Sequence, residues 1–295
     1  MAVTNAVGAL YAARFEQNFY DMSRWVGLTV NHSSETPYGD ELVVNRDATN
    51  VTVQDYTAGT DLTVETRFDT GAVTLALNQR KYYNIYVDDT ESAQVRPSIV
   101  NEATLNAAAK MATEVDAYIR GQAIVGLGAD RMLTDIKAGA TFDDIKDTPT
   151  EAVRNAIVDR ITDAAELADE LYWPESGRVM VISTKVKRAI IDYLLTNKFT
   201  FSGNINDSTY QNFAIANTLG FMPVVDPTIP KTGNDAFRLY FMLRNNGLGY
   251  AQQLSVQETI RAEKRFGDNL RRLMMYGAAR THPDKLLTVK VDPSA

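Results

Sequence analysis

Several residue types on which active sites depend are scarce or absent in this chain of 295 residues. It has no cysteine, which excludes disulfides, thiolate zinc sites and cysteine nucleophiles. It has two histidines, His32 and His282, and each lies beside turn residues. Two histidines are too few ligands for a zinc site without cysteine, and a Ser–His–Asp arrangement would depend on one of them. Neither a G-x-S-x-G elbow nor a G-x-x-x-x-G-K-[ST] phosphate loop occurs. We therefore expect no catalytic residues, no metal and no cofactor.

Membrane and targeting signals are missing as well. No run of about 18 apolar residues is present, and the N-terminus lacks the basic region and apolar run of a signal peptide. A hydrophobic content of 45% and a charged content of 23% are typical of a soluble globular protein. The net charge of −7 argues against a basic surface that binds nucleic acid tightly.

Charge is distributed unevenly along the chain. Residues 141–175 carry ten acidic and three basic side chains, and 10 − 3 leaves seven negative charges. Residues 261–290 carry eight basic and three acidic side chains, and 8 − 3 leaves five positive charges. Two regions of opposite sign allow copies of the chain to attract one another, but they equally fit two solvated faces.

The apolar spacing predicts an α+β fold. Steps of three to five residues between apolar side chains predict helices over 5–26, 98–124, 149–172 and 184–195. The sequence TPTE, Thr148–Glu151, predicts a capping box at the start of the third helix. Ser183 is the expected cap of the fourth.

Alternation of apolar and polar residues predicts strands over much of the remainder. Residues 41–87 form the longest such segment, a ribbon with one apolar face. It has too few large apolar residues to form its own core, so we expect it to lie on another surface. Further strands are predicted at 178–183 and from residue 221 onward.

Three carboxylates, Asp88, Asp89 and Glu91, stand between the ribbon and the helix predicted at 98–124. A calcium loop would need oxygens at alternating positions and a glycine at the turn, and this stretch has neither. We interpret the group as a junction in which acidic side chains cap the positive end of the helix.

The order of these parts resembles that of the major capsid proteins of tailed bacteriophages with the Hong Kong 97-type shell fold, over nearly the whole chain. Three stretches carry the resemblance: VVNRDATNVTVQDYT, LALNQRKYYNIYVDDTESAQ and VQETIRAEKRFGDNLRRLMMYGAARTHPDKL. The residues that match the family's pattern are Asp88, Asp89, Arg261, Phe266, Tyr276, Gly277 and Pro283.

The resemblance implies a division of the chain and a set of contacts. It implies an N-arm (1–39), an extended loop (40–87), a P-domain (88–123 and 256–295) and an A-domain (124–255). The expected contacts between subunits are Phe15, Trp25, Asp55, Tyr56, Arg67, Arg80 and Lys81. Some relatives form Lys–Asn cross-links, and Lys81 lies in the ribbon, but no feature of the sequence shows that it reacts.

The function implied by the resemblance is structural. Many copies would form pentameric and hexameric capsomers and an icosahedral shell around double-stranded DNA, which is packaged without sequence-specific contacts. The implied partners are a portal and a separate scaffolding protein, because the N-arm pattern starts at once; a decoration protein is left open, and no membrane is involved. The protein would belong to the virion and assemble in the host bacterial cytoplasm. Two alternatives stand: an encapsulin-like shell around a protein cargo, and a soluble α+β enzyme.

Overall fold

The computed structural model describes residues 15–36, 38–47, 70–89, 97–139, 148–198, 220–233 and 235–293, together with Val53, Asp55, Ala58 and Phe142. Residues 15–22 are helical. The helices that follow are η1 (Val26–Leu28), η2 (Ser33–Glu35), α3 (Pro97–Ile124), η3 (Ala129–Arg131), α4 (Glu151–Glu170), α5 (Thr184–Lys198) and η5 (Pro283–Lys285). The strands are β1 (Val30–Asn31), β2 (Glu41–Asp47), β3 (Thr70–Ala76), β4 (Gln79–Asp88), β5 (Ile136–Lys137), β6 (Arg178–Ile182), β7 (Met222–Val225), β8 (Leu239–Leu243), β9 (Leu248–Arg261), β10 (Gly267–Arg280), β11 (Leu286–Val289) and β12 (Val291–Asp292).

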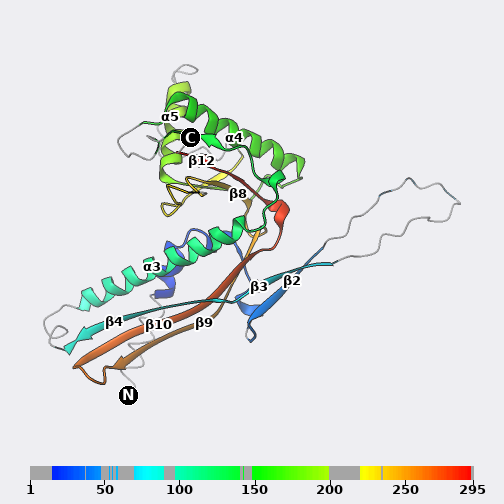
Figure 1. The fold of residues 1–295 in the computed structure, drawn as a ribbon. Helices are drawn as coiled ribbons and strands as arrows, with labels where there is room; N and C mark the ends of the chain where they lie inside the picture. Colours follow the sequence, from blue (N-terminus) through cyan, green and yellow to red (C-terminus); the bar gives the residue numbers. More distant parts are fainter. Residues whose placement is uncertain are drawn as a thin grey trace.

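One sheet, which we call the long sheet, combines strands from distant parts of the chain in the order β1-β9-β10-β4. The strands β9 and β10 form a long antiparallel pair, and β4 lies antiparallel to β10. Figure 1 shows α3 running along one face of this sheet. The helix covers that face with a stripe of apolar residues that includes Met111, Val115 and Ile119. The long amphipathic helix predicted at 98–124 is confirmed.

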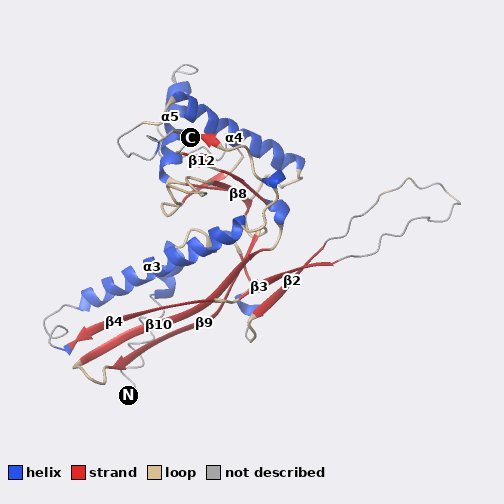
Figure 2. Cartoon of the chain, viewed as in Figure 1, coloured by secondary structure: helices blue, strands red, loops and turns tan. Residues whose placement is uncertain are grey.

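The second sheet, which we call the compact sheet, has the order β11-β8-β6-β7 and is buried on both faces. In β6, Val179 and Val181 face the core shared with α3, whereas Met180 and Ile182 face α4 and α5. Because successive side chains of a strand point to opposite faces, a strand covered on both sides is apolar throughout. Figure 2 shows the resulting layers, with α4 and α5 on the far side of this sheet from α3.

The strands β2 and β3 form a separate antiparallel hairpin that extends away from both sheets (Figure 1). The predicted ribbon of residues 41–87 is therefore divided. Its first part is this hairpin, whereas residues 79–88 form β4 and belong to the long sheet. The alternation is real in both parts, but periodicity alone does not say which strand pairs with which.

The strands at the end of the chain are shared between the two sheets. Strand β9 pairs with β10 from Leu248 onward, so the long sheet begins before residue 256. Conversely, β11 pairs with β8 of the compact sheet, and β12 pairs with β5. The apolar residues of β11 and β12 help to complete the core around α4 and α5, and the division of the chain into domains stays a prediction.

The helix starts show one correction. The N-cap of α4 is Thr150, which has extended dihedrals and accepts a hydrogen bond from the Val153 N–H at 3.4 Å. The cap predicted at Thr148 is wrong, and Thr148 instead accepts a hydrogen bond from Arg188. Ser183 caps α5 as predicted, accepting from the Val186 N–H at 3.3 Å. The helix predicted over 5–26 is described over 15–22.

Candidate assembly surfaces

The root of the hairpin is fixed to the long sheet by a small apolar cluster. Leu75 and Leu77 are buried against Ala251 and Ala279 of β9 and β10. Gly277 allows this approach, because a Cβ built there would lie 2.2 Å from the carbonyl oxygen of Ala76. The hairpin is therefore held firmly at one end.

Beyond its root the hairpin exposes apolar side chains. Val43 in β2 is 55% exposed, and Val53 further along is 90% exposed. Asp55, expected at a contact between subunits, is exposed as well. Tyr56 and Arg67, the other two expected contacts in this region, lie outside the described residues.

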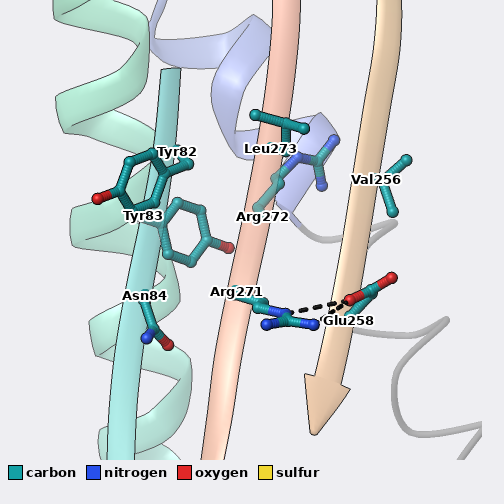
Figure 3. Close-up of a pocket in the computed structure, with 8 residues that line it drawn as sticks. All are labelled: Tyr82, Tyr83, Asn84, Val256, Glu258, Arg271, Arg272 and Leu273. Carbon is teal, nitrogen blue, oxygen red and sulfur yellow. Dashed lines mark hydrogen bonds and ion pairs between the residues drawn. The ribbon is translucent and has the colours of Figure 1, made fainter. Parts of the chain in front are cut away.

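A second exposed surface lies on the face of the long sheet opposite α3. Leu273 pairs with Tyr82 on one side and Val256 on the other, so these three side chains form one row across the sheet. Tyr82 is 78% exposed, and the other two are partly exposed. In the next row Arg271 and Glu258 form an ion pair at 2.9 Å. Residues of both rows line a depression of about 430 Å³. Figure 3 shows these side chains on β4, β10 and β9.

Two more of the expected contacts lie on β4, next to Tyr82 in the sequence. Arg80 is exposed on β4. The Lys81 Nζ lies 3.0 Å from a carboxylate oxygen of Glu114 on α3, so this lysine already has a partner within the chain.

The far tip of the long sheet gathers four residues of the family pattern. Asp89 forms a two-point ion pair with Arg261, one of whose contacts measures 2.8 Å. The Tyr86 hydroxyl contacts the Asp88 carboxylate and donates to the Phe266 carbonyl oxygen, each at 2.9 Å. The Phe266 side chain is largely exposed at this tip. Asp89 and Tyr86 therefore tie β4 to β9 and to the β9–β10 turn, and Asp88 contacts the Tyr86 hydroxyl.

The junction interpretation of these carboxylates is tested only in part. The first turn of α3 itself contains no acidic residue. The contacts described for Asp88 and Asp89 lie at the sheet tip, and their role as caps of the helix stays a prediction. Glu91 lies outside the described residues.

The remaining residues of the family pattern are structural. Tyr276 is fully buried against α3, with its ring 5.7 Å from that of Tyr118, and burial raises its pKa to about 12. Pro283 opens the short helix η5 that leads from the long sheet into β11.

Phe15 and Trp25 lie in the chain's own core, at 1% and 0% exposure. The expectation that they contact a neighbour is therefore corrected, because neither side chain is presented at the surface. Both belong to residues 15–28, which we call the arm segment.

The arm segment is held by an arginine that the sequence analysis overlooked. The guanidinium of Arg272 lies 4.0 Å from the centre of the Phe15 ring and donates to Glu16 at 2.9 Å. It is buried among polar partners that include Gln257 at 3.0 Å. The alternation of residues along β10 could have predicted this role, because it places Arg272 between Leu270 and Met274 on the inward face. A charged side chain on a buried face needs a polar partner.

A second anchor of the arm segment is a buried cluster at its other end, also missed in the sequence. The Asp116 carboxylate on α3 accepts hydrogen bonds from the Ser23 hydroxyl at 2.6 Å and from the backbone N–H groups of Arg24 and Trp25. Burial raises the pKa of Asp116 to about 6, and nearby Asp226 adds to the rise while these hydrogen bonds oppose it.

Asp226, directly after β7, is the second carboxylate of this cluster. It accepts from the Trp25 indole N–H at 2.8 Å and from Arg120 at 2.9 Å. Arg120 also contacts the Thr228 hydroxyl. The cluster therefore joins the arm segment, α3 and the compact sheet at one buried point.

Known catalytic arrangements are not evident in the described part of the chain. His32 lies beside Glu35 at 3.2 Å, and His282 contacts the Asn246 carbonyl oxygen. Over the same residues, no three histidine or acidic side chains are grouped as metal ligands. None of the described helices is long and apolar enough to span a bilayer.

Comparison with solved structures gives the fold. A chain from Mycobacterium phage Che8 has 21% identity and a TM-score of 0.65, with 90% of each chain covered. The capsid of cyanophage P-SCSP1u has 15% identity and a TM-score of 0.65, with 92% of this chain and 89% of the other covered. A virus-like particle from Pyrococcus furiosus has 10% identity and a TM-score of 0.56, covering 96% of this chain and 99% of that one. No family model and no curated protein matches the sequence.

These likenesses cover at least 90% of this chain. The chain has the Hong Kong 97-type shell fold, as the sequence resemblance predicted. The neighbours share the fold at low sequence identity, so they show the fold of this chain but not its function.

Proposed function

We propose that this chain is a major capsid protein of a tailed bacteriophage. Many copies form pentameric and hexameric capsomers and then an icosahedral shell around double-stranded DNA. The observation that carries the proposal is the hairpin of β2 and β3, which is anchored at its root and exposes apolar residues beyond it. A monomer gains nothing from such an extension, whereas a neighbouring copy can cover it.

The exposed row of Tyr82, Leu273 and Val256 supports the same conclusion. It lies on a wide, rigid sheet face rather than in a closed cavity, and its charged neighbours Arg271 and Glu258 neutralise each other. Such a face suits a protein contact with an apolar centre and a polar rim. It does not resemble a pocket for a small substrate, which would be concave and enclosed.

The proposed partners follow from the shell. The chain would bind copies of itself, a scaffolding protein during assembly, and a portal at one vertex, with a decoration protein as a further candidate. A net charge of −7 fits a wall that holds packaged DNA weakly and without sequence preference. The protein would be part of the virion, assembled in the bacterial cytoplasm, and would have no enzymatic role.

A second candidate is an encapsulin-like shell around a protein cargo. The observation in its favour is the likeness to the virus-like particle from Pyrococcus furiosus, which covers nearly all of both chains. Its TM-score of 0.56 is lower than the 0.65 of the phage structures, so we favour the viral shell.

The test is assembly of the full chain in bacteria, alone and with the scaffolding protein encoded beside it. Electron microscopy and sedimentation should show capsomers or closed particles of megadalton size. Particles that contain co-purifying protein and no DNA when the phage packaging proteins are present would favour the cargo shell. A strictly monomeric chain at high concentration, with the scaffold present, contradicts both shells.

A further inference from the structure

The buried cluster between the arm segment, α3 and the compact sheet has an uneven charge balance. It contains two carboxylates, Asp116 and Asp226, at 3% and 0% exposure, but only one guanidinium, that of Arg120. Arg120 contacts Asp226, whereas the hydrogen-bond donors to Asp116 are neutral groups of the arm segment. With every group ionised the cluster therefore carries one negative charge out of water, which is costly.

Among the described residues, Asp116 has no ion pair with a cation. The titratable groups that act on it or line the same cleft are Asp226 after β7, Tyr250 of β9, and Asp21 and Arg24 of the arm segment. Tyr240 of β8 acts on Arg120 and Asp226, the other two charged members of the cluster. Arg24 contributes its backbone N–H, and its side chain is exposed. A cleft of about 220 Å³ lined by Arg24, Thr113 and Asp116 opens beside the carboxylate.

We propose that this cluster is a proton-binding latch, in which uptake of one proton by Asp116 strengthens the docking of the arm segment on α3. The proton comes from solvent and binds the Oδ2 atom, which accepts one hydrogen bond, from the Arg24 N–H. The Oδ1 atom accepts from the Ser23 hydroxyl and the Trp25 N–H, and it keeps both bonds. No bond to carbon changes, and the net effect is removal of the buried negative charge.

The pH dependence of docking follows from the difference in the pKa of Asp116 between the docked and the undocked state. In the docked state burial holds the pKa of Asp116 at about 6, against 3.8 for an ordinary aspartate once the arm segment leaves and water reaches the carboxylate. The docked state therefore binds the proton more tightly, and docking gains strength as the pH falls through 6. Between pH 8 and pH 5 the docking equilibrium should change by roughly tenfold, and above pH 7 the effect should vanish.

The latch is a property of a single chain, so it stands apart from the proposed shell. Its chemistry does not require a neighbour, and it can be measured whether or not particles form. In a shell it would give the position of the arm segment a dependence on proton concentration. The arm segment is also tied to the compact sheet, through the bond from the Trp25 indole to Asp226.

The test is hydrogen–deuterium exchange of the full chain between pH 5 and pH 8, corrected for the pH dependence of intrinsic exchange. The readout is the backbone amides of Ser23 and Leu28, both hydrogen-bonded within the arm segment. Amides of β6, in the compact sheet, serve as the internal reference. We expect opening of the arm segment to be about tenfold rarer at pH 5 than at pH 8, with no such change in β6.

Two variants separate the latch from a general effect of acid. Asp116→Asn cannot titrate, so its arm segment should exchange with no pH dependence, whatever its absolute protection. Ser23→Ala keeps the carboxylate but removes a hydrogen bond that favours its charged form, so the pH midpoint should move upward. A flat wild-type profile or an unchanged slope in Asp116→Asn overturns the proposal. If Asp116→Asn does not fold, an unmoved midpoint in Ser23→Ala overturns it.

Discussion

The guanidinium of Arg120 lies 2.9 Å from the carboxylate of Asp226, and both side chains are almost completely buried. Arg120 belongs to the long helix α3, whereas Asp226 directly follows β7 of the compact sheet. The pair therefore fixes the compact sheet to the helix that carries the long sheet. Its position makes it the strongest candidate for a contact that holds the two halves of the fold together.

Removing one partner of this pair should destabilise the chain severely. In Arg120→Met the Asp226 carboxylate stays buried without its cation, and we expect a loss of roughly 3–5 kcal/mol in the free energy of unfolding. The matched control is Arg160→Met, which breaks a half-exposed ion pair with Asp163 on α4 and should cost less than about 1 kcal/mol. Denaturant unfolding of both variants measures the difference, and equal losses would contradict the importance of the buried pair.

Neighbouring arginines on β10 should behave differently. Arg272 points inward and holds Phe15 and Glu16 of the arm segment, whereas Arg271 points outward to Glu258. We expect Arg272→Met to weaken arm docking by about 1–3 kcal/mol, because a charged hydrogen bond and a cation–π contact are lost. Arg271→Met should leave the arm segment unchanged. Limited proteolysis of residues 15–28 reports the result, and equal cleavage of the two variants would refute the anchor.

A methyl group at Gly277 should disturb the root of the hairpin. Its Cβ would lie 2.2 Å from the Ala76 carbonyl oxygen, so the backbone of β3 or β10 must shift. We expect Gly277→Ala to lower the free energy of unfolding by about 1–3 kcal/mol. Gly121→Ala is the control, since it adds a methyl to α3 where nothing lies within 4 Å, and it should stabilise by up to about 1 kcal/mol. Thermal unfolding distinguishes the two signs.

The exposed row on the long sheet should matter for assembly and not for folding. The double variant Tyr82→Ser, Leu273→Ser removes apolar surface that the chain itself leaves partly open. We expect a change in unfolding temperature of only a few degrees, together with loss of particles in sedimentation. Tyr172→Ser, at an exposed tyrosine beyond the end of α4, is the comparison and should assemble normally. Normal particles from the double variant would remove this face from the proposed contacts.

Shortening the hairpin tests the proposed function most directly. Strand β2 ends at Asp47 and β3 begins at Thr70, so residues 48–69 can be replaced by a short Gly-Ser turn without touching the anchored root. We expect unfolding within about 1 kcal/mol of the wild type, because the buried leucines at the root remain. Capsomers or shells should fail to form in analytical ultracentrifugation. Normal particles contradict the role of the hairpin between subunits, and global unfolding shows that the segment supports the core.

The elements that could be predicted from the sequence are those whose signal is local. The stripe of α3, the cap of α5 at Ser183 and the apolar strand β6 follow from spacing and composition within one window of the chain. The same holds for the alternation of the ribbon, since Tyr83 and Ile85 of β4 are half-buried while their neighbours Tyr82 and Asn84 are exposed. Even the cap of α4 was missed by only two residues, since Thr148 and Thr150 carry the same chemistry.

The way in which these elements pack together is visible only in the folded chain. The tertiary structure assigned β4 to the long sheet and β11 to the compact sheet, because pairing depends on partners that are distant in the sequence, in the case of β4 more than a hundred residues away. It also turned Phe15 and Trp25 from surface contacts into core residues, and Asp116 and Arg272 from ordinary charges into anchors of the arm segment. A charged side chain looks alike in sequence whether water or protein surrounds it. Its burial, and hence its role, is set by the chain segments that fold over it.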